Sequence, residues 1–395
     1  MSSLPGSKQN DSMVGISEIG VAIPDWYIKA EEIAKERDLP PEYVNGGLGL
    51  NKARIPFQTS LEDLITEAVR KIKYQDVERF FIGTESDYDL SKAAVGIDSL
   101  NRKLSLSVVP FQPKFACLGG IQSLLSACEY ALAHKKPAIV IVADRSIYDD
   151  KKAEVTQGSG AVALRIETGP SLLEIKIKRV GQFAQDIDDF RVPARTAPIP
   201  EVDGPLTKPA FIKCVLEAFQ NYKDLGSKKS LLEEIDFLVM HTPFPKMVTW
   251  TAAAIWHYEK EKDKDFLSSL SESLQSPSFF SKFKERLDRV RENTEFQEFF
   301  LKKVAPGLEY NPQIGNCYNA SIFLSLISVL EKIKSGQRVL ILGYGSGAGS
   351  LVFAGQAISQ GFTSGLKKNL QKGRQLDKKQ YLEWRNKIIK SIREK

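Results

Sequence analysis

Cys117 is the residue of this chain whose sequence surroundings most favour covalent chemistry. Two glycines follow it at 119 and 120, and apolar residues then recur at helical spacing as far as Leu132, so the thiol should lie where a helix begins. The free N–H groups and positive dipole of a helix start favour an anion, which predicts a lowered pKa and a reactive thiolate. The glycines would let a substrate carbonyl approach the backbone, whose N–H groups can bind an oxyanion. The alternative is that Cys117 is a small buried apolar residue.

A thiolate nucleophile needs partners that move protons, and three other segments could supply them. His241 follows an apolar run and begins His-Thr-Pro-Phe-Pro-Lys, in which two prolines would stiffen the loop. Glu85 follows the apolar run 79–83 and could act as general acid and base in a partly apolar site. Asn316 follows a glycine at an expected helix start and could supply a neutral amide donor. Each also has an ordinary explanation: a strand-end histidine, a loop carboxylate and a helix N-cap.

The segment 343–349, Gly-Tyr-Gly-Ser-Gly-Ala-Gly, is the most glycine-rich turn of the chain. It resembles a phosphate-binding loop but lacks both the Gly-Lys-Ser/Thr ending and the dinucleotide-binding fingerprint. We therefore interpret it as backbone N–H groups that border an oxyanion site.

Alternating strands and helices are expected to position these residues. Ligands bind beyond the carboxyl ends of strands in open α/β sheets, and Glu85, Cys117, Asp144, His241 and the turn 343–349 all fall at such places. The expected strands are 14–23, 79–83, 104–109, 137–143, 158–166, 172–180, 235–240, 337–342 and 350–354. The expected helices are 28–37, 60–72, 91–100, 121–132, 208–222 and 320–333.

The order of these elements predicts a duplicated α/β unit. Each half runs strand, reactive residue, helix, strand, glycine-rich turn and strand. We expect a first half at 13–170 that carries the cysteine and the glutamate, and a second half at 171–365 with a charged helical insertion at 259–303. A polar tail at 1–12 should be disordered, and a basic helical tail should occupy 366–395.

Composition and charge exclude several classes of function. The net charge is +6, but 366–395 carries 11 Lys and Arg against three Asp and Glu, so the remainder is slightly acidic. Because no aromatic residues interleave with the basic ones to stack bases, we expect no nucleic-acid partner. No apolar run reaches the length of a membrane span, and 1–12 lacks the apolar region of a signal peptide.

Cysteine and histidine usage predicts a cytoplasmic protein without a metal site. The four cysteines show no Cys-x-x-Cys spacing, which suits a reducing compartment better than a disulfide framework. The three histidines form no ligand-spaced cluster with them, so we expect no zinc.

Five motifs in this order resemble the 3-hydroxy-3-methylglutaryl-CoA synthase family of the thiolase superfamily. The resemblance runs from about Val14 into the C-terminal tail. It implies a duplicated thiolase fold with five αβαβα layers, a homodimer, and a place in the mevalonate pathway of isoprenoid biosynthesis. The motifs are Ile82-Gly-Thr-Glu-Ser86, Ala116-Cys-Leu-Gly-Gly120, His241-Thr-Pro-Phe-Pro-Lys246, Gly315-Asn-Cys-Tyr-Asn-Ala-Ser321 and Tyr344-Gly-Ser-Gly-Ala-Gly349.

The same resemblance implies a reaction and a role for each residue. Acetyl-CoA would acetylate Cys117, and Glu85 would remove a proton from the acetyl methyl group. The resulting enolate would attack the ketone of acetoacetyl-CoA, which His241 and Asn316 would hold and polarise. Hydrolysis of the enzyme thioester would release the product, with CoA thioesters as substrates and no separate cofactor. The further implied substrate-binding residues are Lys246 near the CoA phosphates, Ser346 whose backbone joins the Cys117 N–H in the oxyanion hole, and Tyr318, Asp144, Gly120 and Arg191 in support.

Three positions depart from the family pattern and leave the acceptor open. Leu118 stands where Tyr or Lys is common, Ile121 where Thr is common, and Gly343 where Ser is common. The histidine loop and the tail sequence 376–384 are similar to members that act on carrier-protein-bound β-ketothioesters in polyketide β-branching, and a basic tail would suit an acidic acyl carrier protein.

Two other functions remain open from the sequence. One is a Claisen-type condensation like that of a ketoacyl synthase of the third type, which has no need of a carboxylate at Glu85. The other is a non-catalytic scaffold subunit of a complex that channels acyl thioesters.

Overall fold

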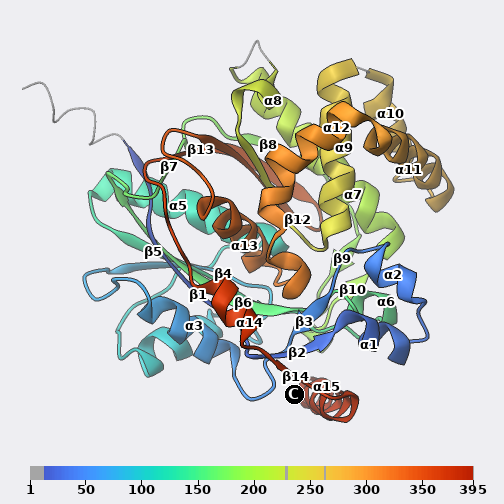
Figure 1. The fold of residues 1–395 in the computed structure, drawn as a ribbon. Helices are drawn as coiled ribbons and strands as arrows, with labels where there is room; N and C mark the ends of the chain where they lie inside the picture. The colour runs from blue at the N-terminus through green and yellow to red at the C-terminus, as the bar shows by residue number, and fades with distance from the viewer. Residues whose placement is uncertain (1–12, 227–229, 262–263, 395) are drawn as a thin grey trace, which may run out of the picture.

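The computed structural model describes residues 13–226, 230–261 and 264–394, so the expected tail at 1–12 lies outside the described residues. A long mixed sheet runs through the molecule (Figure 1), in the order β11-β12-β13-β7-β1-β6-β5-β4, with β8 paired to β13. Its strands are β1 (Val14–Ala22), β4 (Arg79–Gly83), β5 (Ala138–Arg145), β6 (Ser159–Thr168), β7 (Leu173–Ile175), β8 (Gly181–Ala184), β11 (Phe237–Met240), β12 (Arg338–Gly345) and β13 (Gly349–Ala357).

Helices separate and cover the two halves of this sheet. Helix α3 (Leu61–Arg70) packs on β1 and β6, while α5 (Gly119–His134) packs on β4 and β5. Helix α13 (Asn319–Leu330) contacts both α5 and β11, and α7 (Gly204–Asp224) covers β13 and packs against α9 (Pro245–Glu261). The result is the five-layered αβαβα arrangement that was predicted. Its two β layers are continuous, because β7 pairs with β1 on one side and with β13 on the other.

Sequence patterns explain why the elements nearest the site form where they do. All but the last residue of β5 are buried, as expected for a strand covered on both faces. Helix α3 begins with a capping box between Ser60 and Asp63. Every residue of α13 is buried, in keeping with its place between the layers.

The expected strand at 104–109 is wrong, because this segment connects elements without pairing as a strand. The side chain of Asn101 accepts from the N–H of Val108 at 3.1 Å and donates to its carbonyl oxygen at 2.9 Å, which satisfies groups that a neighbouring strand would otherwise bind. Ser105 has a left-handed backbone with φ of 55°, which is incompatible with an extended run.

Three other expected elements are shorter than predicted. The first two residues of the expected helix at 28–37 belong to strand β2 (Trp26–Lys29), and the helical part is α1 (Ala30–Glu36). The helix at 91–100 reduces to α4 (Ala94–Ile97) followed by a π-helical turn, Asp98–Lys103. The strand at 172–180 reduces to β7.

The remaining elements lie around the sheet. Between α9 and α13 lie α10 (Lys264–Glu272), α11 (Pro277–Glu292) and α12 (Thr294–Phe299), and the chain ends with α14 (Leu366–Gln371), β14 (Arg374–Gln375) and α15 (Lys378–Arg393). The segment 366–394 is anchored, since Leu366 and Leu376 are fully buried and β14 pairs with β2. The short elements are α2 (Pro41–Asn45), β3 (Lys52–Arg54), α6 (Lys151–Glu154), β9 (Phe190–Arg191), β10 (Glu201–Val202) and α8 (Leu231–Glu234).

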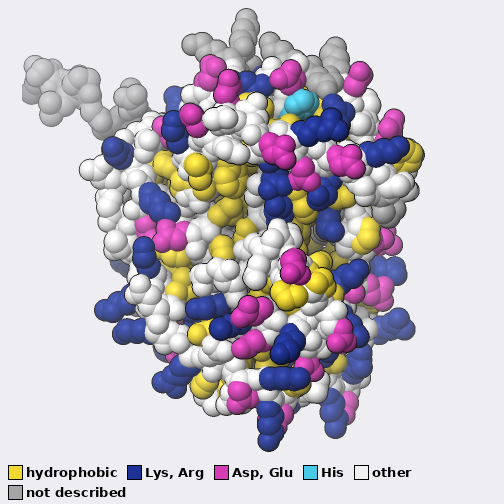
Figure 2. Space-filling model, turned by 45° about the vertical axis from the view of Figure 1, so that its right-hand side comes forward, with side chains coloured by type: hydrophobic (Ala, Val, Ile, Leu, Met, Phe, Trp, Pro, Cys, Tyr) yellow, Lys and Arg dark blue, Asp and Glu magenta, His cyan; other side chains and the backbone are white. Residues whose placement is uncertain are grey.

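The surface mixes charges of both signs. On the face shown in Figure 2, lysine and arginine side chains are interspersed with aspartate and glutamate and do not form one broad basic stripe. In the part of the chain that the structure describes, no helix combines the length and the apolar character needed to cross a membrane.

Candidate active site

A cavity of about 800 Å³ brings together residues from both halves of the chain. This volume lies in the range of small-molecule binding sites. Of the predicted site residues, the cavity wall contains Cys117, His241, Asn316, Tyr318 and Ser346.

Cys117 is the second residue of a short 3₁₀ turn, Ala116–Leu118, that leads directly into α5. Backbone amides in the first turn of a helix have no partner within that helix, so the amide of Cys117 is suited to bind an oxyanion. The predicted lowering of the thiol pKa is wrong. Burial raises the pKa of Cys117 well above its usual value, and the neighbouring Glu85 raises it further. Desolvation and a nearby carboxylate therefore outweigh the helix dipole, and the resting residue is a thiol.

Glu85 follows β4 and approaches Cys117 from behind the cavity wall. Both of its carboxylate oxygens are buried without a hydrogen bond of normal geometry, and the Cys117 thiol approaches them as a donor. Burial and, to a smaller extent, the charge of Asp144 together raise the pKa of Glu85 to about 8, while the hydrogen bond from the Cys117 thiol opposes the rise. A carboxyl group whose pKa lies near neutrality can both accept and return a proton.

Asp144 holds Glu85 in place and is not accessible to a substrate. It is fully buried at the end of β5, and its two oxygens accept five hydrogen bonds. Oδ1 accepts from the backbone of Glu85 at 2.7 Å, and Oδ2 accepts from the backbone of Asn319 at 3.0 Å. The implied substrate contact of Asp144 is therefore corrected to a supporting role.

His241 continues β11 into the cavity. The backbone N–H of His241 donates to the carbonyl oxygen of Leu342 at 3.0 Å. The centre of its imidazole ring lies 6.1 Å from that of the Phe211 ring on α7. Burial lowers the pKa of His241 to about 3, so the imidazole is neutral at physiological pH. Its Nδ1 is buried without a hydrogen-bond partner. A neutral imidazole can donate a hydrogen bond to a carbonyl oxygen and so polarise it.

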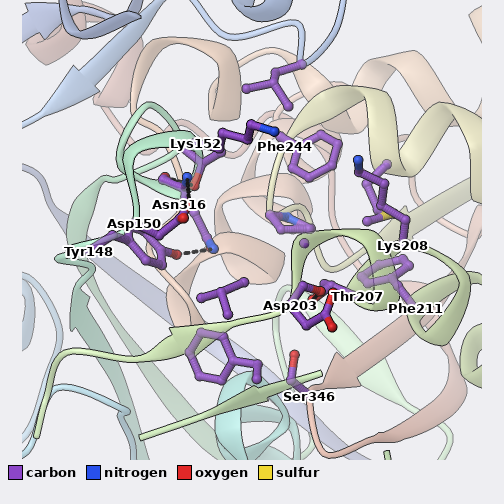
Figure 3. Close-up of a pocket in the computed structure, with 18 of the residues that line it drawn as sticks. Tyr148, Asp150, Lys152, Asp203, Thr207, Lys208, Phe211, Phe244, Asn316 and Ser346 are labelled. Carbon is purple, nitrogen blue, oxygen red and sulfur yellow. Dashed lines mark hydrogen bonds between the residues drawn. The ribbon is translucent and has the colours of Figure 1, made fainter. Parts of the chain in front are cut away.

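Asn316 has a fixed orientation at the start of α13. Its Oδ1 accepts from the N–H of Tyr318 at 2.9 Å and from the hydroxyl of Ser321 at 3.2 Å. Its Nδ2 faces the hydroxyl of Tyr148 at 3.4 Å, as the dashed line in Figure 3 shows. The amide therefore directs its donor toward Tyr148, and both residues line the cavity.

Tyr148 is a cavity residue that the sequence analysis missed. It forms a buried cluster with Cys117 and Tyr318, and the two tyrosine rings meet edge to face at 6.1 Å. The available signal was its place four residues after Asp144, just beyond the carboxyl end of a buried strand. The hydroxyl of Tyr318 is buried and makes no hydrogen bond of normal geometry, with the hydroxyl of Tyr148 close to it.

The glycine-rich hairpin between β12 and β13 packs against the Cys117 turn. A Cβ atom at Gly345 would lie 2.6 Å from the carbonyl oxygen of Phe115, so only glycine permits this approach. Asp189 fixes the hairpin by accepting from the Tyr344 hydroxyl at 3.2 Å and from the Gly347 N–H at 3.0 Å. This arrangement places Ser346 at the cavity, on the wall opposite Lys152 and Phe244 in Figure 3.

Two implied substrate-binding residues have other roles. The N–H of Gly120 donates to Oδ1 of Asn319 at 2.7 Å, and a Cβ atom at Gly120 would lie 2.6 Å from Val142, so this glycine serves helix packing. The side chain of Arg191 is 63% exposed and pairs with Glu201 at 2.9 Å, outside the cavity. Its neighbour Phe190 lines the wall instead.

Lys246 lies in a second cavity of about 570 Å³ that shares Lys208 with the first. Lys284 and Arg291 line the same space. Burial lowers the pKa of Lys246, and the neighbouring Arg291 and Lys284 add to this effect. Asp288 and Glu292 line this space as well, and Asp288 is ion-paired with Lys284 and Arg291, so the four cations leave a net charge of +2, which favours a phosphate-bearing ligand.

The three departures from the family pattern form one packed unit behind the nucleophile. A Cβ atom at Gly343 would lie 2.9 Å from Cδ1 of Leu118 and 2.9 Å from Cγ1 of Ile121. Leu118 in the 3₁₀ turn and Ile121 on α5 therefore occupy space that the glycine on β12 leaves free.

Comparisons with known proteins agree with this arrangement. Hydroxymethylglutaryl-CoA synthase from Enterococcus faecalis is 27% identical over 91% of this chain and 85% of its own length. The human mitochondrial hydroxymethylglutaryl-CoA synthase is 26% identical over 86% of this chain and 73% of its own length.

Solved structures with the same fold carry similar descriptions. MvaS in complex with 3-hydroxy-3-methylglutaryl coenzyme A superposes with a TM-score of 0.80 at 23% identity, covering 94% of this chain and 91% of that one. The curacin biosynthetic HMG synthase in complex with acetyl donor-ACP gives 0.79 at 22% identity, covering 95% and 88%. These likenesses establish the fold.

Family models match almost the whole chain. The model of the hydroxymethylglutaryl-coenzyme A synthase N-terminal region matches residues 10–171, and that of the C-terminal region matches residues 173–389. The protein is therefore a member of the hydroxymethylglutaryl-CoA synthase family of condensing acyltransferases.

Proposed function

We propose that this enzyme joins an acetyl group carried on Cys117 to the ketone of a β-ketoacyl thioester. The observation that carries the proposal is the contact of the buried carboxyl group of Glu85 with Cys117, whose thiol lies on the wall of a cavity that His241 and Asn316 also line. A thiol and a carboxyl group of raised pKa, together with neutral donors, are what this condensation needs.

The first step is transfer of the acetyl group. The sulfur of Cys117 attacks the thioester carbonyl, and the bond to the CoA sulfur breaks. The thiol proton ends on the departing CoA thiol, with neutral His241 and Glu85 as the groups that can carry it. The amides of Cys117 and Ser346 stabilise the charge that develops on the carbonyl oxygen.

The second step forms the carbon–carbon bond. Glu85 takes a proton from the acetyl methyl group, and the enolate carbon attacks the ketone of the acceptor. Protonated Glu85 then returns this proton to the ketone oxygen, which becomes a hydroxyl, while neutral His241 polarises that oxygen by a hydrogen bond and Asn316 orients the acceptor. Water then cleaves the thioester, which frees the product carboxylate and restores the Cys117 thiol.

The acceptor is proposed to enter past the basic mouth formed by Lys208, Lys246, Lys284 and Arg291. The phosphate groups of CoA fit this charge, and a phosphopantetheine arm on an acidic carrier protein fits it as well.

A homodimer is proposed from an apolar surface beside the edge strand β4. Val109 is 83% exposed, and Leu90 and Phe111 are 58% and 48% exposed on the same connecting region. Exposed apolar residues that gather in this way mark association surfaces. Val109→Asp should therefore convert a dimer to a monomer in light scattering.

The four buried free cysteines support the proposed cytoplasmic location. The mevalonate pathway is the proposed setting for a CoA-bound acceptor.

Intact-protein mass spectrometry tests the proposed function. Acetyl-CoA should add one acetyl group, and addition of acetoacetyl-CoA or an acetoacetyl carrier protein should then discharge it as a hydroxylated dicarboxylic product. Comparing the two acceptors identifies the natural one. An enzyme that takes no acetyl group would be a scaffold, and one that releases a β-ketoacyl product would be a Claisen enzyme.

A further inference from the structure

A buried carboxylate anchors the C-terminal helix α15 to the back of the active-site wall. Glu154, at the end of α6, has a fully buried side chain that pairs with Arg385 of α15 at 3.0 Å and with Arg37 at 2.7 Å. It also accepts a hydrogen bond from the hydroxyl of Tyr381 at 2.5 Å. Because a buried charge is strongly destabilising once its partners are removed, α15 and the loop before α6 are held together.

Arg385 also reaches the cavity residue Tyr148. Its Nη2 donates to the carbonyl oxygen of Tyr148 at 3.0 Å, and its guanidinium lies 3.6 Å from the carboxylate of Asp149. The ring of the same tyrosine lies in the buried cluster with Cys117. The tail therefore holds the backbone of a residue whose side chain faces the nucleophile.

Tyr381 supports Asn316, the residue that is hydrogen-bonded to Tyr148. Its hydroxyl is hydrogen-bonded to Nε2 of Gln157, and Gln157 forms a β-bridge with Asn316. The carbonyl oxygen of the adjacent Thr156 accepts a hydrogen bond from the backbone N–H of Asn316 at 2.7 Å. Helix α15 thus supports both partners of the Tyr148–Asn316 hydrogen bond, which come from two different halves of the chain.

The sequence of α15 is built for this inward contact. Tyr381, Trp384 and Ile389 are buried, and the side chain of Arg385 is only 12% exposed. Their spacing places them on one face of the helix. The outward face carries Lys379 and Lys390, whose side chains are 86% and 74% exposed.

We propose that Arg385 and Tyr381 are positioning residues that set the distance between Tyr148 and Asn316, and thereby the placement of the acceptor thioester. The kinetic part of this inference rests on the proposed function. A misplacement of about 1 Å can cost roughly 100-fold in rate, so a contact outside the cavity can still control the reaction.

Arg385→Met, Arg385→Lys and Tyr381→Phe test the inference, with Lys379→Ala on the outward face as the control. We expect Arg385→Met and Tyr381→Phe to lower kcat/KM for condensation about tenfold or more, and to lower acetylation of Cys117 by a smaller factor. Arg385→Lys should recover part of the loss because it restores the charge beside Glu154. The control should match the wild type. Melting temperatures are recorded for all four variants, and rates are compared where each is folded.

A double-mutant cycle separates positioning from general stability. In a Tyr148→Phe background, Arg385→Met should cost less than about threefold, because the hydrogen bond it supports is already absent. Losses that multiply would overturn the inference, as would variants that melt earlier yet condense at the wild-type rate. If Arg385→Met does not fold, the same cycle is measured with Tyr381→Phe in the Tyr148→Phe background and is judged by the same criteria.

Alkylation by iodoacetamide gives a readout that does not depend on the proposed reaction. Cys128, Cys214 and Cys317 are fully buried, so the first alkyl group should enter at Cys117 on the cavity wall. Arg385→Met should change this rate several-fold, and Lys379→Ala should not. A wild-type enzyme that takes no acetyl group would contradict the proposed function, whereas equal alkylation rates would contradict the positioning role.

Discussion

The backbone N–H of Glu85 donates to Oδ1 of Asp144 at a distance of 2.7 Å. The other oxygen of Asp144 accepts from the N–H of Asn319, the first residue of α13. A single buried carboxylate therefore joins the strand that presents the proposed base to the helix start next to Asn316. The two halves of the duplicated fold meet at this point.

Asp144→Asn should weaken the fold and change the titration of Glu85. The new amide nitrogen would face donors, which leaves buried groups unsatisfied at a cost of roughly 1–3 kcal/mol. Removing the negative charge should also lower the pKa of Glu85, since that charge raises it. Urea unfolding measures the first effect, and the pH dependence of condensation measures the second. A variant with wild-type stability and an unchanged pH profile would contradict the supporting role.

Glu85→Gln should remove a pH-dependent loss of stability. An unfolded chain releases this proton near pH 4.5, whereas burial delays its release to about pH 8 in the folded protein. The folded state therefore binds more protons between these values, and its stability falls as the pH rises through this window. Between pH 5 and pH 8, the free energy of unfolding of the wild type should fall by on the order of 4 kcal/mol relative to that of Glu85→Gln. Free energies of unfolding at pH 5 and pH 8 measure it, and parallel curves for the two proteins would contradict a buried Glu85 with a raised pKa.

The chemistry-bearing residues could be predicted because each follows a buried strand or begins a helix. Glu85, Cys117, His241 and Asn316 converge as expected, since strand ends meet at one edge of a sheet. The protonation of Cys117 could not be predicted, because it depends on burial and on a carboxylate 32 positions away in sequence. The same limit applies to Tyr148, which has no motif of its own.

The errors in secondary structure also have physical causes. The alternating run 104–109 has the composition of a strand, but Asn101 takes the backbone groups that a strand would use. Gly120 and Arg191 occupy motif positions, yet the first fits a tight packing contact and the second faces solvent. Neither contact is visible from sequence spacing.

Gly343→Ala should destabilise the packed unit behind the nucleophile. The added methyl group would meet Leu118 and Ile121 at 2.9 Å, so their flexible ends must shift at a cost of roughly 1–3 kcal/mol. Combining it with Ile121→Val should restore part of that stability, because the second change removes volume at the contact. Thermal unfolding of the single and double variants measures this coupling. Strictly additive effects would contradict the contact.

Chelation should leave the reaction unchanged. Among residues 13–226, 230–261 and 264–394, no three His, Cys, Asp or Glu side chains gather as metal ligands. The proposed steps use a thiol, a carboxyl group and neutral donors only. Condensation rates with and without EDTA should therefore agree, and a loss that zinc or magnesium restores would contradict this mechanism.

Acetyl transfer and condensation should separate cleanly between the two residues in contact. Cys117→Ala should take up no acetyl group, because among the described residues it is the only cysteine that lines the cavity. Glu85→Ala should still accept the acetyl group, more slowly, and should fail to pass it to the acceptor. The decisive measurement is intact-protein mass spectrometry of Glu85→Ala after acetyl-CoA and then the β-ketoacyl thioester. A persistent acetyl-enzyme is the predicted result, and normal discharge into a condensed product would contradict the role of Glu85 as the base.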